Sequence, residues 1–445
     1  MKLLAIRFAK DVQARPTLVP HSPHPPFRPL ENAAFRFPLC LEGFPLISLR
    51  SGRGILPVTL SSSHLRPSEM LDNEPTADDG DTRRTPDASQ PQPGDDVAGD
   101  GNPGGDNAGD DDDDDDDTPE GRATQLNMYL SDDGEVLDLT GNQLKDLAGI
   151  PLPPTLTDLD LTTNRLAALD PRIGDLERLE KLSFRQNLIT DAAAAGLKDL
   201  TRLTSLKELV LRDNLLKKVP LVSPLTALSL LDLSYNHIHA MAPLATAPSG
   251  VRELYLANNR IGHIEALEGF TQLRLLELGS NKIREMEHLS HLTALEELWV
   301  GRNKIKEVHV AGLTALVKIS VQSNRLTCMR GFETCTRLQE LYLSNNGISV
   351  MEGLEALTNL RILDLAANAI THVQGLDTLT RLEDLWLNDN RIESLQQLMA
   401  ALDGPKASLV TLYLERNPCA QEAGYIEALA KMLPKAVEID SKPVR

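Results

Sequence analysis

Leucine and polar positions alternate in one phrase that recurs thirteen times along the chain, L-x-x-L-x-L-x-x-N-x-[I/L]. In each copy a residue of varied character stands between two apolar residues, as Asp232 stands between Leu231 and Leu233. Alternation with a period of two is typical of a β-strand whose apolar side chains point inward and whose middle side chain points outward. Each copy closes on an asparagine, and neighbouring asparagines are mostly 22 residues apart. These residues are Asn142, Asn164, Asn187, Asn214, Asn236, Asn259, Asn281, Asn303, Asn324, Asn346, Asn368, Asn390 and Asn417.

A fixed period of roughly 20 to 29 residues with this wording predicts a leucine-rich repeat solenoid. The expected fold is an α/β solenoid of about 13 repeats, each with one short parallel strand. Apolar residues at three-residue intervals follow each asparagine, as in Ile283, Met286 and Leu289, and this spacing favours a short 3₁₀ or helical turn on the opposite face. Strands pack about 4.8 Å apart and the outer turns need more room, so we expect a curved sheet on the concave side.

The repeats are predicted to form a solenoid over residues 123–417 and a C-terminal cap over residues 418–445. The cap includes a helical pattern from Tyr425 to Leu433 and closes the last apolar face of the stack. Two intervals between asparagines lengthen to 27 residues, around Ala192–Ala195 and Ala400–Ala407, and predict longer outer helices there. The asparagine side chain has donors and an acceptor, so we expect it to satisfy backbone groups at each turn and to be structural rather than catalytic.

The outward residues of the predicted strands form one column along the concave face. Both tryptophans and three of the six tyrosines of the chain fall on this column. Aromatic residues favour strands in general, but large rings on an exposed face typically mark a contact surface, and Trp and Tyr are the usual anchors of protein interfaces. The column consists of Asp138, Asp160, Ser183, Val210, Asp232, Tyr255, Glu277, Trp299, Ser320, Tyr342, Asp364, Trp386 and Tyr413.

Acidic residues flank the column and indicate a partner whose matching face carries Lys or Arg. From Asp232 to Tyr413 the column spans eight strand steps, roughly 38 Å at about 4.8 Å a step, which suits a globular domain better than a peptide. The flanking acids are Glu208, Glu253, Glu297, Glu340 and Asp384.

The net charge of −19 is concentrated in one segment of the chain. Residues 67–122 are rich in Asp, Gly and Pro and contain eight consecutive aspartates from Asp110 to Asp117. We expect this acidic tail to be disordered, because so few apolar residues cannot offset chain entropy; it either keeps the protein solvated or attracts or shields a basic surface. Residues 1–66 are basic, Pro-rich and aperiodic, and they fit a disordered extension better than a mitochondrial transit peptide.

The sequence predicts no catalytic site, no metal and no cofactor. His288 and His291 have helical spacing but no third ligand nearby in sequence, so a surface pair is expected. Nucleophile-elbow, Walker, H-E-x-x-H and dinucleotide patterns do not occur, and an open sheet offers no pocket in which two carboxylates would acquire different pKa values. The four cysteines, without C-x-x-C spacing, are interpreted as reduced thiols; they are Cys40, Cys328, Cys335 and Cys419.

Two further classes of partner are not expected. An acidic concave face does not suit the phosphate backbone of a nucleic acid. No apolar run approaches the roughly 20 residues that a membrane span requires. The sequence therefore favours a protein partner.

Five stretches of the chain, in order and in register, resemble the protein phosphatase 1 regulatory subunit 7 family. They are LRLLELGSNKIREM from Leu273, VQSNRLTCMRGF from Val321, LQELYLSNNGISVMEGL from Leu338, LWLNDNRIESL from Leu385 and LYLERNP from Leu412. The likeness covers about residues 123–443. It implies a non-catalytic regulatory subunit that holds the catalytic subunit of type 1 serine/threonine phosphatase on its concave face and controls its activity, maturation and location in nucleus and cytoplasm.

The resemblance also implies which residues bind that partner. Tyr255 and Trp299 stand where Phe is usual in the family, and Asp384 stands where Glu is usual, so aromatic and acidic character are kept. No R-V-x-F docking motif occurs in the tails, and binding is expected from the sheet. The residues matched by motif are Asp232, Tyr255, Glu277, Trp299, Asp364, Asp384, Trp386 and Tyr413, to which the column adds Tyr342.

The expected state of the free protein is a monomer, and the resemblance leaves room for further phosphatase regulators as partners. A rival interpretation is a leucine-rich repeat scaffold for cytoskeletal, ciliary or spliceosomal proteins, which share the repeat class. The proteins that copurify with the chain distinguish the two.

Overall fold

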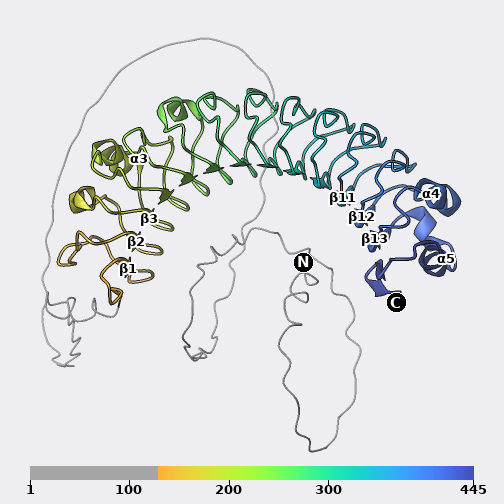
Figure 1. Cartoon of the computed structure of the whole chain (residues 1–445), viewed down its shortest axis with the longest axis horizontal. Helices are drawn as coiled ribbons and strands as arrows, with labels where there is room; N and C mark the ends of the chain where they lie inside the picture. The colour runs from red at the N-terminus through yellow and green to blue at the C-terminus, as the bar shows by residue number, and fades with distance from the viewer. Residues whose placement is uncertain (1–128, 445) are drawn as a thin grey trace, which may run out of the picture. The chain divides into compact units, whose positions relative to one another are not determined.

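The computed structural model describes residues 129–444, so the predicted segments 1–66 and 67–122 lie outside the described residues. The described chain winds into an arc of stacked coils, with a strand from each coil on the inner side (Figure 1). Thirteen strands pair in parallel in the order of the sequence, and a fourteenth joins them in parallel. A fifteenth strand pairs antiparallel with the fourteenth and completes one 15-stranded sheet. The predicted leucine-rich repeat solenoid is confirmed.

Each of the first thirteen strands is three residues long. They are β1 Val136–Asp138, β2 Asp158–Asp160, β3 Lys181–Ser183, β4 Glu208–Val210, β5 Leu230–Asp232, β6 Glu253–Tyr255, β7 Leu275–Glu277, β8 Glu297–Trp299, β9 Lys318–Ser320, β10 Glu340–Tyr342, β11 Ile362–Asp364, β12 Asp384–Trp386 and β13 Thr411–Tyr413. The last two strands are β14 Glu438–Ile439 and β15 Lys442–Pro443. The helices are η1 Pro171–Asp175, α3 Asp191–Ala194, η2 Ala195–Asp199, η3 Ala242–Thr246, α4 Leu395–Ala401, η4 Pro418–Gln421 and α5 Tyr425–Met432.

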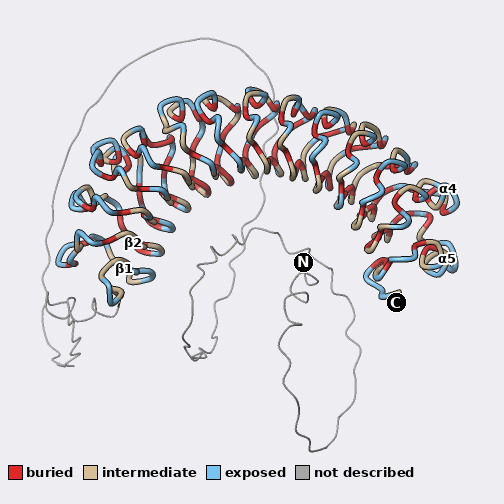
Figure 2. The backbone as a smooth tube through the Cα atoms, viewed as in Figure 1, coloured by how far each residue is buried: buried red, intermediate tan, exposed pale blue. Residues whose placement is uncertain are grey.

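One continuous apolar core runs inside the coils. The middle residue of each of these thirteen strands is buried, as Leu231 and Leu298 are at 0% exposure. Figure 2 shows buried residues recurring in every coil, between the strands and the outer turns. Burying one leucine contributes about 1.5–3 kcal/mol, so each repeat is stabilised by its neighbours and not by contacts of its own alone.

The repeat asparagines satisfy the backbone where each strand ends, as predicted. Asn281 is typical: its Nδ2 donates to the carbonyls of Leu256 and Leu278, at 2.9 and 3.0 Å, and its Oδ1 accepts from the backbone N–H of Ile261 at 2.9 Å. The residue before each asparagine, from Thr163 to Arg416, adopts a left-handed backbone with φ between 53° and 61°. This turn reverses the chain sharply enough to place the asparagine side chain inside the stack.

The convex side contains fewer helices than the three-residue spacing predicts. Among the described residues most repeats cross it in turns, although their hydrogen bonds still join residues three apart, as from Leu292 N–H to the Leu289 carbonyl at 2.9 Å. The apolar residues at these intervals are thus buried without a regular helix. The two long intervals do contain helices, α3 with η2 and α4, and the cap contains α5 and adds β14 to the sheet.

Candidate partner-binding site on the concave face

The outward residues predicted from the repeat lie on one ladder of paired positions, which we call the concave ladder. In the observed register Asp232 pairs with Tyr255, Tyr255 with Glu277, and Glu277 with Trp299. The ladder continues in the same register from Trp299 to Tyr413. Eight of the nine predicted site residues lie on it, and Asp384 is the first residue of β12, beside it on the same face. The period of the sequence therefore brings these side chains onto one surface.

The centre of the ladder is an aromatic cluster held by a salt bridge. The rings of Trp299 and Tyr342 are nearly parallel, at 19°, with centroids 6.4 Å apart, although β9 lies between their strands. They meet over Ser320, whose small side chain is buried beneath them at 3% exposure. The Lys318 ammonium lies 5.4 Å from the centroid of the Trp299 ring and 2.8 Å from Oε2 of Glu340.

Hydrogen bonds orient the polar ends of these rings. Trp299 Nε1 donates to Glu297 at 3.1 Å, and the Tyr342 hydroxyl donates to Glu340 at 2.8 Å. In β6 the Tyr255 hydroxyl donates to Glu253 at 2.8 Å in the same way. Each donor and acceptor are two residues apart on one strand, so both project from the same face. The flanking acids thus fix the rings as well as contributing charge.

A second aromatic pair lies at the C-terminal end of the ladder. Trp386 and Tyr413 meet edge to face at 77°, with centroids 6.1 Å apart. The Tyr413 hydroxyl donates to Glu438 of β14 at 2.6 Å, so the cap contributes a residue to the site. Trp386 Nε1 is buried and has no hydrogen-bond partner among the described residues. Both tryptophans lie on the outward face and are half-buried against their neighbours.

The N-terminal part of the site is acidic. Burial is the main cause that raises the pKa of the Asp232 and Glu277 carboxyls above their ordinary values. The negative charge of Asp232 raises the pKa of Glu277 further. The Arg212 guanidinium, 4.0 Å from Asp232, lowers the pKa of both carboxyls. Tyr255 lies between the two acids on the ladder.

Asp364 and Asp384, the other two acidic residues of the predicted site, differ in exposure. Asp364 is only 2% exposed, and Gln322 Nε2 and the backbone N–H of Ala366 donate to its carboxylate at 2.8 and 3.0 Å. It faces the concave side as predicted, but it is not open to solvent. Asp384 is half-buried. Burial raises the pKa of both carboxyls.

Four residues of the site were not among those predicted: Arg212, Lys318, Gln322 and Glu438. Lys318 and Glu438 occupy the same strand position as the flanking acids and were identifiable from the repeat period, although a search for acids alone passes over Lys318. Gln322 reaches Asp364 from two repeats away. The sequence of a single repeat does not indicate a contact between side chains that lie two repeats apart.

The remaining candidate residues from the sequence include a histidine and three cysteines, and their contacts lie within the fold. His291 Nε2 lies 2.8 Å from the Leu267 carbonyl oxygen. Cys328, Cys335 and Cys419 are free thiols. Between residues 129 and 444 no group of three His, Cys, Asp or Glu side chains has an arrangement that would hold a metal ion. In the same range no helix has the length and apolar character of a membrane span.

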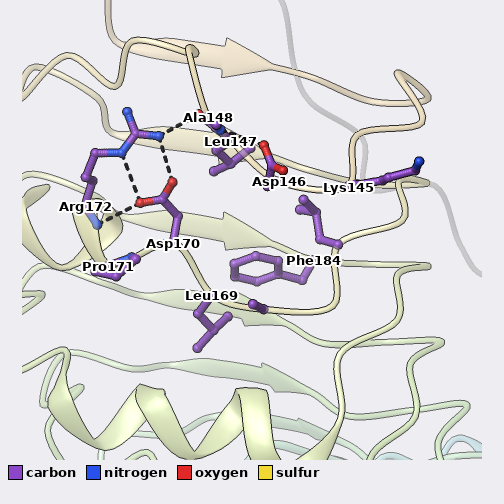
Figure 3. A pocket seen from close by; sticks show the side chains of 11 residues that line it. Lys145, Asp146, Leu147, Ala148, Leu169, Asp170, Pro171, Arg172 and Phe184 are labelled. Carbon is purple, nitrogen blue, oxygen red and sulfur yellow. Dashed lines mark hydrogen bonds and ion pairs between the residues drawn. The ribbon is translucent and has the colours of Figure 1, made fainter.

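A hollow of about 400 Å³ lies outside the ladder, near the N-terminal end of the described chain. Figure 3 shows Arg172 and Asp170 beside the apolar side chains that line it. The Arg172 guanidinium donates to the Asp170 carboxylate and to the carbonyls of Leu147 and Ile150. These contacts join neighbouring repeats and engage Arg172 and Asp170 within the chain, so we interpret this part of the hollow as structural.

Comparison with known proteins agrees with the fold. The family model described as Leucine Rich repeats (2 copies) matches residues 336–379. The protein phosphatase 1 regulatory inhibitor subunit PPP1R7 homolog of Arabidopsis thaliana is 52% identical over 312 residues, which cover 70% of this chain and 95% of that protein. The U2 small nuclear ribonucleoprotein A′ of Mycosarcoma maydis is 38% identical over only 61 residues, 14% of this chain and 25% of that protein. Among solved structures, an internalin of Listeria monocytogenes aligns over 73% of this chain and 88% of its own, with a TM-score of 0.59 and 25% identity.

Proposed function

The chain belongs to the protein phosphatase 1 regulatory subunit 7 family, and from this we propose that it binds the catalytic subunit of type 1 serine/threonine phosphatase on its concave face. In this proposal the chain is a non-catalytic subunit that controls the activity and the location of the enzyme in nucleus and cytoplasm. The observation that carries it is the concave ladder. Over eight strand steps it presents aromatic rings and carboxylates on one surface, which is the composition of a protein contact with a basic partner.

The contact is proposed to have two apolar anchors with acidic groups around them. The anchors are the Trp299–Tyr342 cluster and the Trp386–Tyr413 pair, and Asp364 lies between them on the ladder. The rings are already packed and hydrogen-bonded in the free chain, so little side-chain freedom is lost on binding. Aromatic residues fixed in this way are the usual hot spots of an interface.

The carboxylates give the contact its orientation. Asp232 and Glu277 flank Tyr255 at one end, and Asp384 lies beside Trp386 at the other. A partner that places Lys or Arg against both ends and apolar groups against the rings binds in one register. Unlike Trp299 Nε1, Trp386 Nε1 is unpaired. An unpaired buried donor costs about 1–3 kcal/mol, which an acceptor of the partner would recover after a small rotation of the ring.

The test is a binding measurement with Trp299→Ala combined with Trp386→Ala. Each anchor is worth about 2 kcal/mol or more, so the two together are worth about 4 kcal/mol, and the dissociation constant of the phosphatase catalytic subunit is expected to rise by roughly 700-fold. Circular dichroism checks that the variant is folded. A matched control is Leu221→Ala with Val350→Ala, which truncates two large residues that are 46% and 47% exposed and lie off the ladder.

Unchanged binding by the double tryptophan variant would refute the concave ladder as the docking surface. Equal loss in the control would show that the variants act through general destabilisation. A copurification experiment with the unmodified chain tests the partner itself. Recovery of spliceosomal or cytoskeletal proteins without the phosphatase would refute the proposed function.

A further inference from the structure

One edge of the solenoid carries a row of cations that the proposed phosphatase contact does not use. We call it the basic rim, and it lies where the chain turns after strands β6 to β9. Its members are Arg260, Lys282, Arg302, Lys304 and Arg325. Four of them directly follow a repeat asparagine, and Arg302 directly precedes one. The rim is therefore separate from the outward strand residues of the concave ladder.

The backbone holds the rim in one line. The N–H groups of Arg260, Lys282, Lys304 and Arg325 each donate to a carbonyl of the preceding repeat, all at 2.8 Å. Residues bonded in this way are stacked one repeat above the next, so their side chains emerge about one strand spacing apart, roughly 5 Å. Four repeats in succession thus present a cation at the same place.

No carboxylate forms an ion pair with these cations within the described chain. None of the ion pairs between residues 129 and 444 includes a rim residue. On the other edge, where the chain enters the strands, cations are paired: Lys207 lies 2.8 Å from Glu180 and Arg361 lies 2.7 Å from Glu383. The contrast shows that the repeat can pair its cations across neighbouring coils and does not do so along the rim.

A hollow of about 400 Å³ opens at the start of the rim. Arg260 and Asn258 line it, and the Nδ2 of Asn258 is buried with no hydrogen-bond partner among the described residues. His237 also lines the hollow, and Asp213 is the single carboxylate among its lining residues. An unused amide donor beside a guanidinium is an arrangement that accepts a carboxylate.

We propose that the basic rim binds the aspartate run of this same chain, Asp110–Asp117. Charge is the first argument: the run offers eight consecutive carboxylates, and the rim offers five cations in a row with no partner in the described chain. An extended chain alternates its side chains, so one face of the run carries a carboxylate about every 7 Å. Flexible Lys and Arg side chains spaced at roughly 5 Å can meet such a row.

Reach is the second argument. Eleven residues lie between Asp117 and Tyr129, the first described residue, and they span at most about 40 Å. Arg260 follows β6, five strand steps from β1, which is about 24 Å, and Arg325 follows β9, about 38 Å away. The whole rim is within the contour length of the connecting segment. A covalently linked segment also binds at an effective concentration in the millimolar range, so a weak site suffices.

The first test is zero-length carbodiimide cross-linking of the full chain, followed by mass spectrometry. Amide links are expected between residues 110–117 and the rim lysines Lys282 and Lys304. Their yield is expected to fall at least fivefold when NaCl rises from about 20 mM to about 500 mM, because the screening length shortens. Lys181 and Lys207 lie nearer to Tyr129 along the arc and serve as internal controls for simple proximity.

The result that overturns the proposal is a cross-link pattern that follows distance from Tyr129 or that lacks Lys282 and Lys304. A mixture of isotope-labelled and unlabelled chains separates the two sources of the acidic run. Links within one chain support the proposal. Links that join labelled to unlabelled chains would mean that a second copy occupies the rim, and would overturn it.

The second test uses a fluorescent octa-aspartate peptide as probe. Replacing all eight aspartates of the run by Asn is expected to increase the affinity of the full chain for the probe about tenfold, because the rim is released. Adding Lys282→Glu with Lys304→Glu is expected to abolish that gain. Arg252→Glu with Arg337→Glu, two exposed cations at the other edge, is the matched control and is expected to preserve it. No gain in the Asn variant, or equal loss in the control, refutes the proposal.

Discussion

Replacing one repeat asparagine by alanine tests how the stack is held together. Asn281 lies in the middle of the array, between Asn259 and Asn303, and is 8% exposed. Its amide makes two short hydrogen bonds to carbonyls and accepts one from the Ile261 N–H. We expect Asn281→Ala to lower the free energy of unfolding by about 3–5 kcal/mol.

The magnitude follows from which groups lose their only partner. The Leu256 carbonyl also accepts from Asn259 at 3.1 Å, and the Leu278 carbonyl also accepts from Asn303 at 2.9 Å. Both carbonyls therefore keep one donor, and each lost bond costs about 1 kcal/mol. The Ile261 N–H has no other acceptor among the described residues, and an unpaired buried N–H costs about 1–3 kcal/mol.

The assay is urea unfolding of the full chain followed by circular dichroism, with the slope of the transition checked because repeat arrays can unfold in parts. Asn142→Ala is the control. Asn142 is the first of the repeat asparagines and is half-exposed, and among the described residues its side chain makes one hydrogen bond, to the Thr140 carbonyl at 3.3 Å. It is expected to lose less than about 1 kcal/mol. Losses that agree within about 1 kcal/mol at the two positions would refute the reasoning.

Three more predictions concern charge, thiols and backbone. Lowering the pH from neutrality toward the ordinary titration range of carboxyl groups is expected to weaken phosphatase binding but not to lower the urea midpoint of the chain. Because their pKa values are raised, Asp232 and Glu277 lose their charge at a higher pH than ordinary carboxyls do. An acid with a raised folded-state pKa binds its proton more tightly in the folded than in the unfolded chain, so protonation of these two groups does not destabilise the fold. Calorimetry with the Asp232→Asn, Glu277→Gln variant should show that phosphatase binding depends less on pH, and a decline of the urea midpoint over this range would contradict the argument. Iodoacetamide at pH 7.5 is expected to alkylate half-buried Cys328 at least tenfold faster than Cys335. Cys335 is buried, and burial raises the pKa of its thiol to about 11. Mass spectrometry measures the alkylation rate of both thiols, and equal rates would be inconsistent with the burial of Cys335. Gly331→Ala is expected to destabilise the chain by more than about 2 kcal/mol in urea unfolding, since φ is 104° and the added Cβ would lie 2.2 Å from a carbonyl oxygen; a neutral effect would mean that this turn relaxes freely.

Most of the fold can be predicted from the period of the sequence. Leucine spacing identified the strands, and the paired register follows from it, because equal repeats stack with equivalent positions side by side. The same period placed residues as distant in sequence as Asp232 and Tyr413 on one ladder. It also identified the structural role of the asparagines, since the turn after each strand leaves the same backbone groups to be paired. Helices in the long intervals were predictable from length and alanine content.

What the sequence by itself determined is therefore the direction in which each side chain points, because strand alternation and stacking are local and repeat without change. Only the tertiary structure decided how side chains from different coils share the space on that face. The Trp299 and Tyr342 rings meet because Ser320 leaves room between them, and Asp364 is covered by Gln322 from two repeats away. Contacts of this kind depend on side-chain volume and rotamer across two or more strands, and a pattern read one repeat at a time contains neither.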